Sequence, residues 1–418
     1  MSQTPPTPDA APHAEPSPPT AVAQTNTGVV TTRRTGATYP ALDGLRTVAV
    51  AAVVTTHVAF STGRYERGFG NNFLARMDSG VTIFFVLSGF LLIRPWLLTI
   101  AEGRDLPSTR VYALRRFARI YPAYLAAVTL AFLVLPENRG VTLGDWVRHV
   151  FLLQTYGTGH LRGGLTQTWS LCVEWAYYLA LPFFGILLVR WSRDRWRPGL
   201  LLGVLGGLVA FSVAWEVVTH PLGGAFATSG LWLPAYVAWF AGGMFLAVLK
   251  VHLDTQTVRQ DSRWWFAEEL GRHPWTCWAI AGLCYFAALT PIAGPRSFTE
   301  SGLGTTITKH LLYLVVAVML AWPAIFGESR SVQALLGNRV MRYFGEISYG
   351  VFLYHLVVLQ GVMWLLDYSL FTGDVVQVLP LTLVGTGVLA ALSYRFLERP
   401  LIRRAHRVRS GGGVPVRG

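Results

Sequence analysis

The sequence predicts an all-α polytopic membrane protein with about ten transmembrane helices and both termini in the cytoplasm. Its 418 residues are 52% hydrophobic and only 14% charged, whereas soluble domains carry about a quarter charged residues. The apolar residues come in blocks of about 20, the length at which an α-helix crosses the hydrocarbon core of a bilayer. A single buried soluble core explains this pattern poorly.

Ten such blocks follow one another along the chain, and each is predicted as one membrane span. They cover residues 42–60, 80–100, 118–136, 168–190, 199–218, 230–250, 274–292, 307–326, 344–366 and 377–395. The segment 143–156 is amphipathic and short, so it is not counted as a span.

Basic residues orient the predicted bundle. With the N-terminus inside, the cytoplasmic segments hold 24 Lys and Arg residues and the outer segments hold 8. Positively charged loops tend to stay in the cytoplasm, so this asymmetry predicts that both termini lie there. The net charge of +13 is then mostly a topology signal, with some attraction to anionic lipid. It requires no nucleic acid partner.

Composition divides the chain into three parts. Residues 1–38 are rich in Pro, Thr and Ala and lack an apolar core, so we expect a disordered cytoplasmic tail. No signal-peptide core precedes Arg33. Residues 39–404 form the predicted transmembrane domain, and residues 405–418 form a flexible cytoplasmic tail. No Walker loop, dinucleotide-binding glycine motif or fused soluble catalytic domain is recognisable.

The cysteines indicate no metal site. All three lie within predicted helices, none has metal-ligand spacing, and small buried hydrophobes are their expected role. They are Cys172, Cys277 and Cys284.

The first span carries two unusual polar residues, Arg46 and His57. Eleven residues turn an α-helix by about 1100°, which is about 20° past three full turns, so the two share a face about 16 Å apart along the axis. Asp43 lies about 60° away on the same side. An arginine near a helix end can simply reach the lipid head groups. A histidine deep in a span usually faces a cavity or a partner.

The fourth span offers that partner. Gln167, Ser170, Glu174 and Tyr178 fall at steps of three and four and form a polar stripe. Glu174 lies at a depth similar to that of His57, and a buried carboxylate needs a partner. We predict a pair in which Glu174 orients the imidazole and raises its basicity. Alternatively, Glu174 pairs with an arginine and only holds helices together.

A cationic cluster is predicted at the cytoplasmic side. Arg115, Arg116 and Arg119 begin the third span, and Arg46 and Arg94 lie at similar depth. Guanidinium groups suit phosphate oxygens, although such residues also serve as plain topology signals. Phosphates held inside and a base about 16 Å deeper suit acyl-coenzyme A, whose thioester ends a long arm. An anion transporter would also fit these residues.

Six motifs occur in a fixed order. They are "ALDGLRTVAVAAVVTTHVAF", "GVTIFFVLSGFLL", "RRFARIYP", "TWSLCVEWAYYLALP", "GEISYGVFLYHLVV" and "FLERPLIRR". Together, over about residues 39–404, they closely resemble the acyltransferase family 3 of membrane proteins. The resemblance implies O-acyl transfer from cytoplasmic acyl-CoA to a hydroxyl, usually on a sugar.

The resemblance also implies roles for individual residues. His57 matches the family's catalytic histidine, and Arg46 its donor-binding arginine. Arg116 and Arg119 match its RxxR motif, and Glu174 its acidic residue in the fourth span. The chain departs from the family pattern at Thr82, where many members carry an acidic residue.

Other residues in the motifs have two candidate roles. Ser88 and Gly89 are small and allow helices to approach closely, so packing is the favoured role for Ser88. Tyr178 and His355 are candidates for the acceptor cavity, but His355 also fits a hydrogen-bonded core histidine.

The sequence therefore predicts a membrane O-acyltransferase in a bacterial plasma membrane. His57, supported by Glu174, would take the proton of the acceptor hydroxyl. No bound cofactor is expected, because acyl-CoA, most simply acetyl-CoA, is the donor substrate. An envelope glycan outside or a macrolide inside would be the acceptor. A transporter is the non-enzyme alternative.

Overall fold

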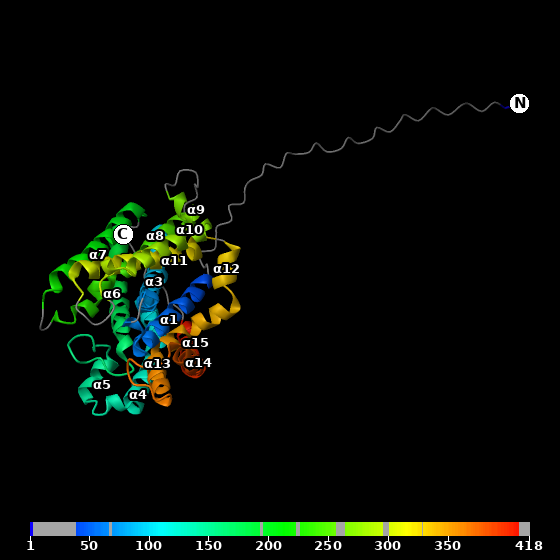
Figure 1. The fold of residues 1–418 in the computed structure, drawn as a ribbon. Helices are drawn as coiled ribbons and strands as arrows, with labels where there is room; N and C mark the ends of the chain where they lie inside the picture. Colours follow the sequence, from blue (N-terminus) through cyan, green and yellow to red (C-terminus); the bar gives the residue numbers. More distant parts are fainter. Residues whose placement is uncertain are drawn as a thin grey trace. The chain divides into compact units, whose positions relative to one another are not determined.

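The structure is a computed structural model that describes residues 1–2, 39–66, 69–192, 195–222, 226–255, 264–295, 301–327 and 329–408. The chain divides into two compact units, Met1–Ala37 and Thr38–Gly418, and only the second is considered below (Figure 1). The predicted N-terminal tail lies almost wholly outside the described residues. So does most of the predicted C-terminal tail.

Throughout the described ranges the second unit contains helices and no strand, which confirms the all-α class. Nine helical segments of the described chain are long and apolar enough to cross a membrane. The long helices are α1 (Pro40–Ser61), α3 (Gly80–Glu102), α4 (Thr109–Val134), α6 (Trp169–Ser192), α7 (Pro198–Thr219), α8 (Leu233–Thr255), α11 (Leu303–Phe326), α13 (Arg339–Leu365) and α14 (Val375–Ser393).

The seventh predicted span is shorter than the sequence indicated. Helix α10 (Pro274–Ala288) has 15 residues, about 22 Å of helix, against a hydrocarbon core of about 30 Å. It stops because Thr290 is extended ahead of Pro291, and a residue before proline is disfavoured in the α conformation. The apolar block continues to residue 292, but the helix does not.

Short elements connect the long helices. The segment predicted to lie outside the span count contains α5, which has eight residues. The short helices are α2 (Phe69–Ala75), α5 (Leu143–Val150), α9 (Trp265–Arg272), α12 (Arg330–Leu336) and α15 (Arg399–Arg407). The single turns are η1 (Arg64–Glu66), η2 (Arg76–Ser79), η3 (Pro136–Asn138), η4 (Thr166–Thr168), η6 (Ser229–Leu231), η7 (Pro291–Ala293) and the π-helical η8 (Tyr394–Glu398).

Helix α1 packs along both α3 and α13, and α8 packs tightly on α3 (Figure 1). Glycines permit the closest of these approaches. A Cβ at Gly89 of α3 would clash with the carbonyl of Phe240 in α8, and one at Gly243 of α8 would clash with the carbonyl of Val86 in α3. In lipid, helices associate by such close van der Waals packing because there is no hydrophobic drive between them. The packing role predicted for Gly89 is confirmed.

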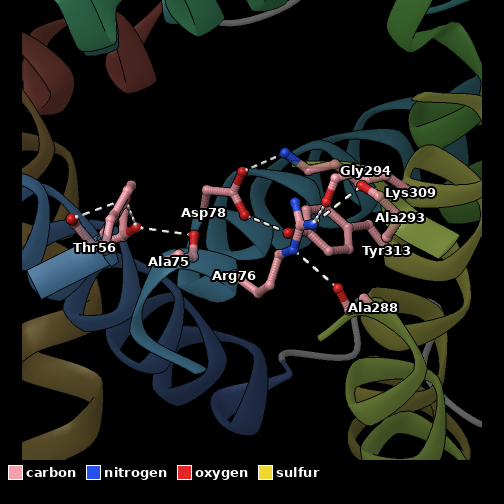
Figure 2. A network of polar contacts seen from close by, with 10 residues as sticks. Thr56, Ala75, Arg76, Asp78, Ala288, Ala293, Gly294, Lys309 and Tyr313 are labelled. Carbon is pink, nitrogen blue, oxygen red and sulfur yellow. Dashed lines mark hydrogen bonds and ion pairs between the residues drawn. The ribbon is translucent and has the colours of Figure 1, made fainter. Parts of the chain in front are cut away.

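A buried polar network ties α10 and α11 to the start of α3 (Figure 2). Arg76, only 4% exposed, donates to the carbonyl oxygens of Ala288 at 2.9 Å, Ala293 at 3.1 Å and Gly294 at 2.6 Å. Ala288 is the last residue of α10, and the carbonyl at a helix end has no partner within its own helix. Asp78, two residues on, accepts from Lys309 at 2.7 Å and from Tyr313. Arg76 is therefore a cap that stabilises the end of the short helix.

Gly243→Ala should destabilise the protein, because the added methyl group meets the backbone of α3. Overpacking of this kind typically costs about 1–3 kcal/mol. Gly206→Ala in α7 is the control, since a Cβ there meets nothing within 4 Å. Thermal unfolding in detergent should show a lowered midpoint for the first variant only. Equal midpoints would contradict the packing role of Gly243.

The orientation of the bundle remains a prediction from its basic residues, and labelling would test it. In a Cys284→Ser background, Ser369→Cys should react with a membrane-impermeant maleimide added to whole cells. Asp105→Cys, between α3 and α4, should react only after permeabilisation. The reverse pattern would place the termini outside. Both positions are exposed, so a failure to react would reflect the side of the membrane rather than burial.

Candidate active site

Three predicted donor-binding residues line one cavity of about 270 Å³, here called the arginine cavity. They are Arg46 from α1 and Arg116 and Arg119 from α4. The wall also includes the polar residues Ser88, Glu174 and Tyr178 and the aromatic residues Phe84, Phe85 and Phe352. The cavity thus combines cationic, polar and aromatic side chains.

Each arginine of this cavity is held differently. Arg46 forms an ion pair with Asp43 at 2.7 Å. The Arg116 guanidinium lies 5.8 Å from the centre of the Tyr178 ring. Arg119 donates to the carbonyl oxygen of Glu346 at 3.2 Å.

The predicted cationic cluster is smaller than the sequence suggested. Arg94 and Arg115 are not among the residues that line the arginine cavity. The Arg94 guanidinium instead lies over the rings of Tyr39 at 5.1 Å and Phe90 at 5.6 Å.

Glu174 does not pair with His57, contrary to the prediction. Its carboxylate accepts hydrogen bonds from the hydroxyl of Ser88 at 2.6 Å and from that of Tyr178. Tyr178 lies one turn along the same helix, at the i,i+4 spacing at which side chains meet. The carboxylate therefore orients two hydroxyl groups in the arginine cavity.

Ser88 and Tyr178 also have places other than those predicted. Ser88 was assigned to packing, but it bonds Glu174 and lines the arginine cavity. Tyr178 was a candidate for the acceptor cavity that holds His57, but it lines the arginine cavity instead. A signal for Ser88 was present in the sequence, because it is a polar residue in the middle of an apolar block.

His57 pairs with His355. Nδ1 of His57 lies 2.8 Å from the carbonyl oxygen of Val53 and 3.1 Å from Nε2 of His355. Nδ1 of His355 lies 2.7 Å from the carbonyl oxygen of Phe352. A carbonyl can only accept, so we assign the proton of each neutral ring to Nδ1. Nε2 of His57 then carries a lone pair and has no partner among the described residues, which is the state of a general base.

His355 is a core residue rather than a cavity residue. Its side chain is fully buried, and it is absent from the wall of the cavity that His57 lines. Of its two predicted roles, the structure shows the hydrogen-bonded core histidine. Its Nε2 accepts from His57 and so holds that ring in one tautomer.

His57 lines a second and larger cavity of about 850 Å³, here called the histidine cavity. Aromatic rings supply part of its wall, from Trp169, Trp364 and Tyr368. Its polar wall comes from Gln167, Gln360 and Glu137. Gln360 donates to Glu137 at 2.7 Å. Except for Gln167, sequence reasoning missed these residues, because most come from loops and helix ends outside the recognised motifs.

The two cavities lie next to each other. Trp169 lines the histidine cavity, and the next residue, Ser170, lines the arginine cavity. On α13, Phe352 lines the arginine cavity and Leu356 lines the histidine cavity, a rise of about 6 Å. His355 lies between these two residues. The rings of Phe84 and Phe352 meet edge to face at 6.4 Å, and both line the arginine cavity only.

Thr82, where the chain departs from the family pattern, lies outside both cavities. It is fully buried, and its hydroxyl has no hydrogen-bond partner among the described residues. Within the described residues, no three His, Cys, Asp or Glu side chains gather closely enough to hold a metal ion.

The fold and the site together define a class of protein: a polytopic helical membrane protein in which a cationic cavity adjoins a cavity that contains a histidine. The family described as an acyltransferase domain matches residues 39–394. The chain therefore belongs to the acyltransferase family 3, as its motifs predicted.

Relatives are bacterial proteins. The chain is 25% identical over 390 residues to the peptidoglycan O-acetyltransferase OatA of Listeria monocytogenes, covering 89% of this chain and 57% of that protein. It is 26% identical over 382 residues to the putative peptidoglycan O-acetyltransferase YrhL of Bacillus subtilis, covering 87% and 54%. It is 32% identical over 213 residues to the acyltransferase MdmB of Streptomyces mycarofaciens, covering 48% and 52%.

The chain spans a little over half the length of these curated relatives. No solved structure matches the chain. The matches establish family membership and support a multi-pass membrane protein of a bacterium.

Proposed function

We propose that the protein is a membrane O-acyltransferase. It would move an acyl group, most simply acetyl, from cytoplasmic acyl-CoA to a hydroxyl of a sugar-containing acceptor. One observation carries the proposal: His57, whose Nε2 has no partner among the described residues, lines a large cavity next to a cavity that three arginines line. Family membership supports the reaction class.

The donor would occupy the arginine cavity. Arg46, Arg116 and Arg119 would bind the phosphates of acyl-CoA, because guanidinium groups match phosphate oxygens with paired N–H donors. The pantetheine arm would pass Ser88 and Tyr178, whose hydroxyls Glu174 orients. The acyl end would then reach the wall at Phe84 and Phe352, next to His57.

The proposed chemistry uses His57 as base and then as acid. Nε2 of His57 takes the proton of the acceptor hydroxyl. The hydroxyl oxygen attacks the thioester carbonyl at the same time, and the carbon–sulfur bond then breaks. The imidazolium returns the proton to the departing thiolate, which leaves as CoA. His355 keeps Nδ1 of His57 protonated throughout, so Nε2 is always the reacting nitrogen.

The acceptor would enter the histidine cavity from the outer side. Aromatic faces and a few amide and carboxylate groups suit the apolar face and hydroxyls of a sugar ring, and the cavity offers both. In the predicted orientation this cavity opens away from the cytoplasm. The relatives named for peptidoglycan agree with an envelope glycan. A macrolide-type acceptor, the alternative that the sequence left open, is the second candidate.

Reconstitution would test the enzyme class directly. Protein in proteoliposomes should release free CoA thiol from acetyl-CoA when soluble glycan fragments are supplied on the other side, and the glycan should gain the acetyl group. A macrolide acceptor should work on the donor side instead. Transport of intact acetyl-CoA without thiol release would contradict the proposal and favour a transporter.

Replacing Arg116 and Arg119 together by Ala should weaken acetyl-CoA binding. Each lost hydrogen bond to a charged group should cost roughly 1.5–3 kcal/mol. Arg94→Ala is the matched control, because Arg94 stacks on aromatic rings outside the cavity wall. Binding is measured by calorimetry in detergent. Unchanged acetyl-CoA affinity in the double variant would mean that Arg116 and Arg119 serve only as topology signals.

His57→Ala should lower the transfer rate about 10²–10⁴-fold, the usual contribution of a general base, and leave acetyl-CoA binding intact. His273→Ala is the control, because that side chain is 63% exposed and far along the chain from the cavity residues. Single-turnover rates and elution profiles are the measurements. A well-folded His57→Ala protein with a normal transfer rate would contradict the mechanism. A variant that fails to fold would make His57 a structural residue.

A further inference from the structure

The turn after α14 buries a carboxylate that sequence reasoning passed over. Glu398 is 0% exposed. One of its oxygens accepts from Ser393 at 3.3 Å, and the other, Oε2, has no hydrogen-bond donor in the described part of the chain. Burying a carboxylate without a partner costs several kcal/mol. Its cationic neighbour is Arg119, with Nη1 at 3.9 Å from Oε2.

The π-helical turn η8 brings Glu398 to this position. The buried residues of α14 recur every four positions and end with Ala390. In an uninterrupted α-helix, Glu398 would point about 80° away from Ala390, since eight residues turn about 800°. The wider π turn at Tyr394–Glu398 inserts an extra residue and offsets that rotation. Such turns are rare and occur frequently at functional sites.

Arg119 is left able to bind a ligand. A distance of 3.9 Å is too long for a hydrogen bond, so Glu398 acts on Arg119 through its charge. Of the five N–H groups of a guanidinium, one at Nη2 is used by the carbonyl of Glu346. The side chain is 29% exposed and lines the arginine cavity. Arg116, the other arginine of the motif, lies over the ring of Tyr178 and forms no ion pair with a carboxylate among the described residues.

We propose that Glu398 is a positioning residue for the donor. It holds the Arg119 guanidinium at the wall of the arginine cavity and balances its charge while no phosphate is bound. A preorganised cation loses less freedom when the ligand arrives, so the donor binds more tightly. This inference rests on the proposed donor site.

A double-mutant cycle tests the inference. Acetyl-CoA binding is measured for Glu398→Gln, Arg119→Ala and the double variant of the full chain in detergent. Glu398→Gln should weaken binding about tenfold, within the range for residues in direct contact. In the Arg119→Ala background the same change should have almost no further effect. A purely structural glutamate would weaken binding equally in both backgrounds.

Two matched controls and one conservative variant complete the double-mutant cycle. Combined with Arg116→Ala, Glu398→Gln should act additively, because its charge does not hold Arg116. Glu346→Gln should leave binding unchanged, since Glu346 meets Arg119 only through its backbone carbonyl. Glu398→Asp keeps the charge and should retain more affinity than Glu398→Gln. Elution profiles check that each variant is folded.

The outcomes distinguish a failure of this inference from a failure of the proposed donor site. If Arg119→Ala leaves acetyl-CoA affinity unchanged, the proposed donor site is wrong. If Arg119→Ala weakens binding but Glu398→Gln does not, or the two effects add, only the positioning role is overturned. If neither Glu398→Gln nor Glu398→Asp elutes as a folded protein, Glu398 is a structural residue and the inference is overturned.

Discussion

The close approach of α1 to α13 determines the geometry of both cavities. A Cβ at Gly345 of α13 would clash with the carbonyl of Asp43 in α1, and one at Gly44 of α1 would clash with the carbonyl of Leu336, the last residue of α12 just before α13. Because the two backbones meet there, His57 further along α1 comes within 3.1 Å of His355. A side chain larger than hydrogen at these glycines would push the helices apart. The imidazole pair depends on that separation.

Polar groups inside the bundle are paired in small, separate sets. His57 and His355 form one, and Ser88, Glu174 and Tyr178 form another. Each set satisfies groups that would be costly alone in an apolar surrounding. Because these two sets are separate, the carboxylate of Glu174 does not raise the basicity of His57. The imidazole of His57 contacts the carbonyl oxygen of Val53 and the ring of His355 instead.

Sequence alone could locate the helices and the residues on them, because hydropathy and the helical repeat are local properties. It could place Arg46 and His57 on one face for the same reason. It could not choose the partner of His57. Depth in the membrane gives a position along a helix, whereas contact also depends on rotation and neighbours. Glu398 escaped notice because the π turn breaks the repeat from which a buried face is predicted.

The two ends of α1 serve different cavities, and this changes the meaning of the Arg46–His57 spacing. A single continuous path from phosphate to base would leave a polar channel through the bilayer. In the structure, Arg46 and His57 line two different cavities. In the proposed reaction only a small, uncharged acyl group passes from one cavity to the other. The charged donor and the polar acceptor stay in different cavities, so the membrane can remain sealed during transfer.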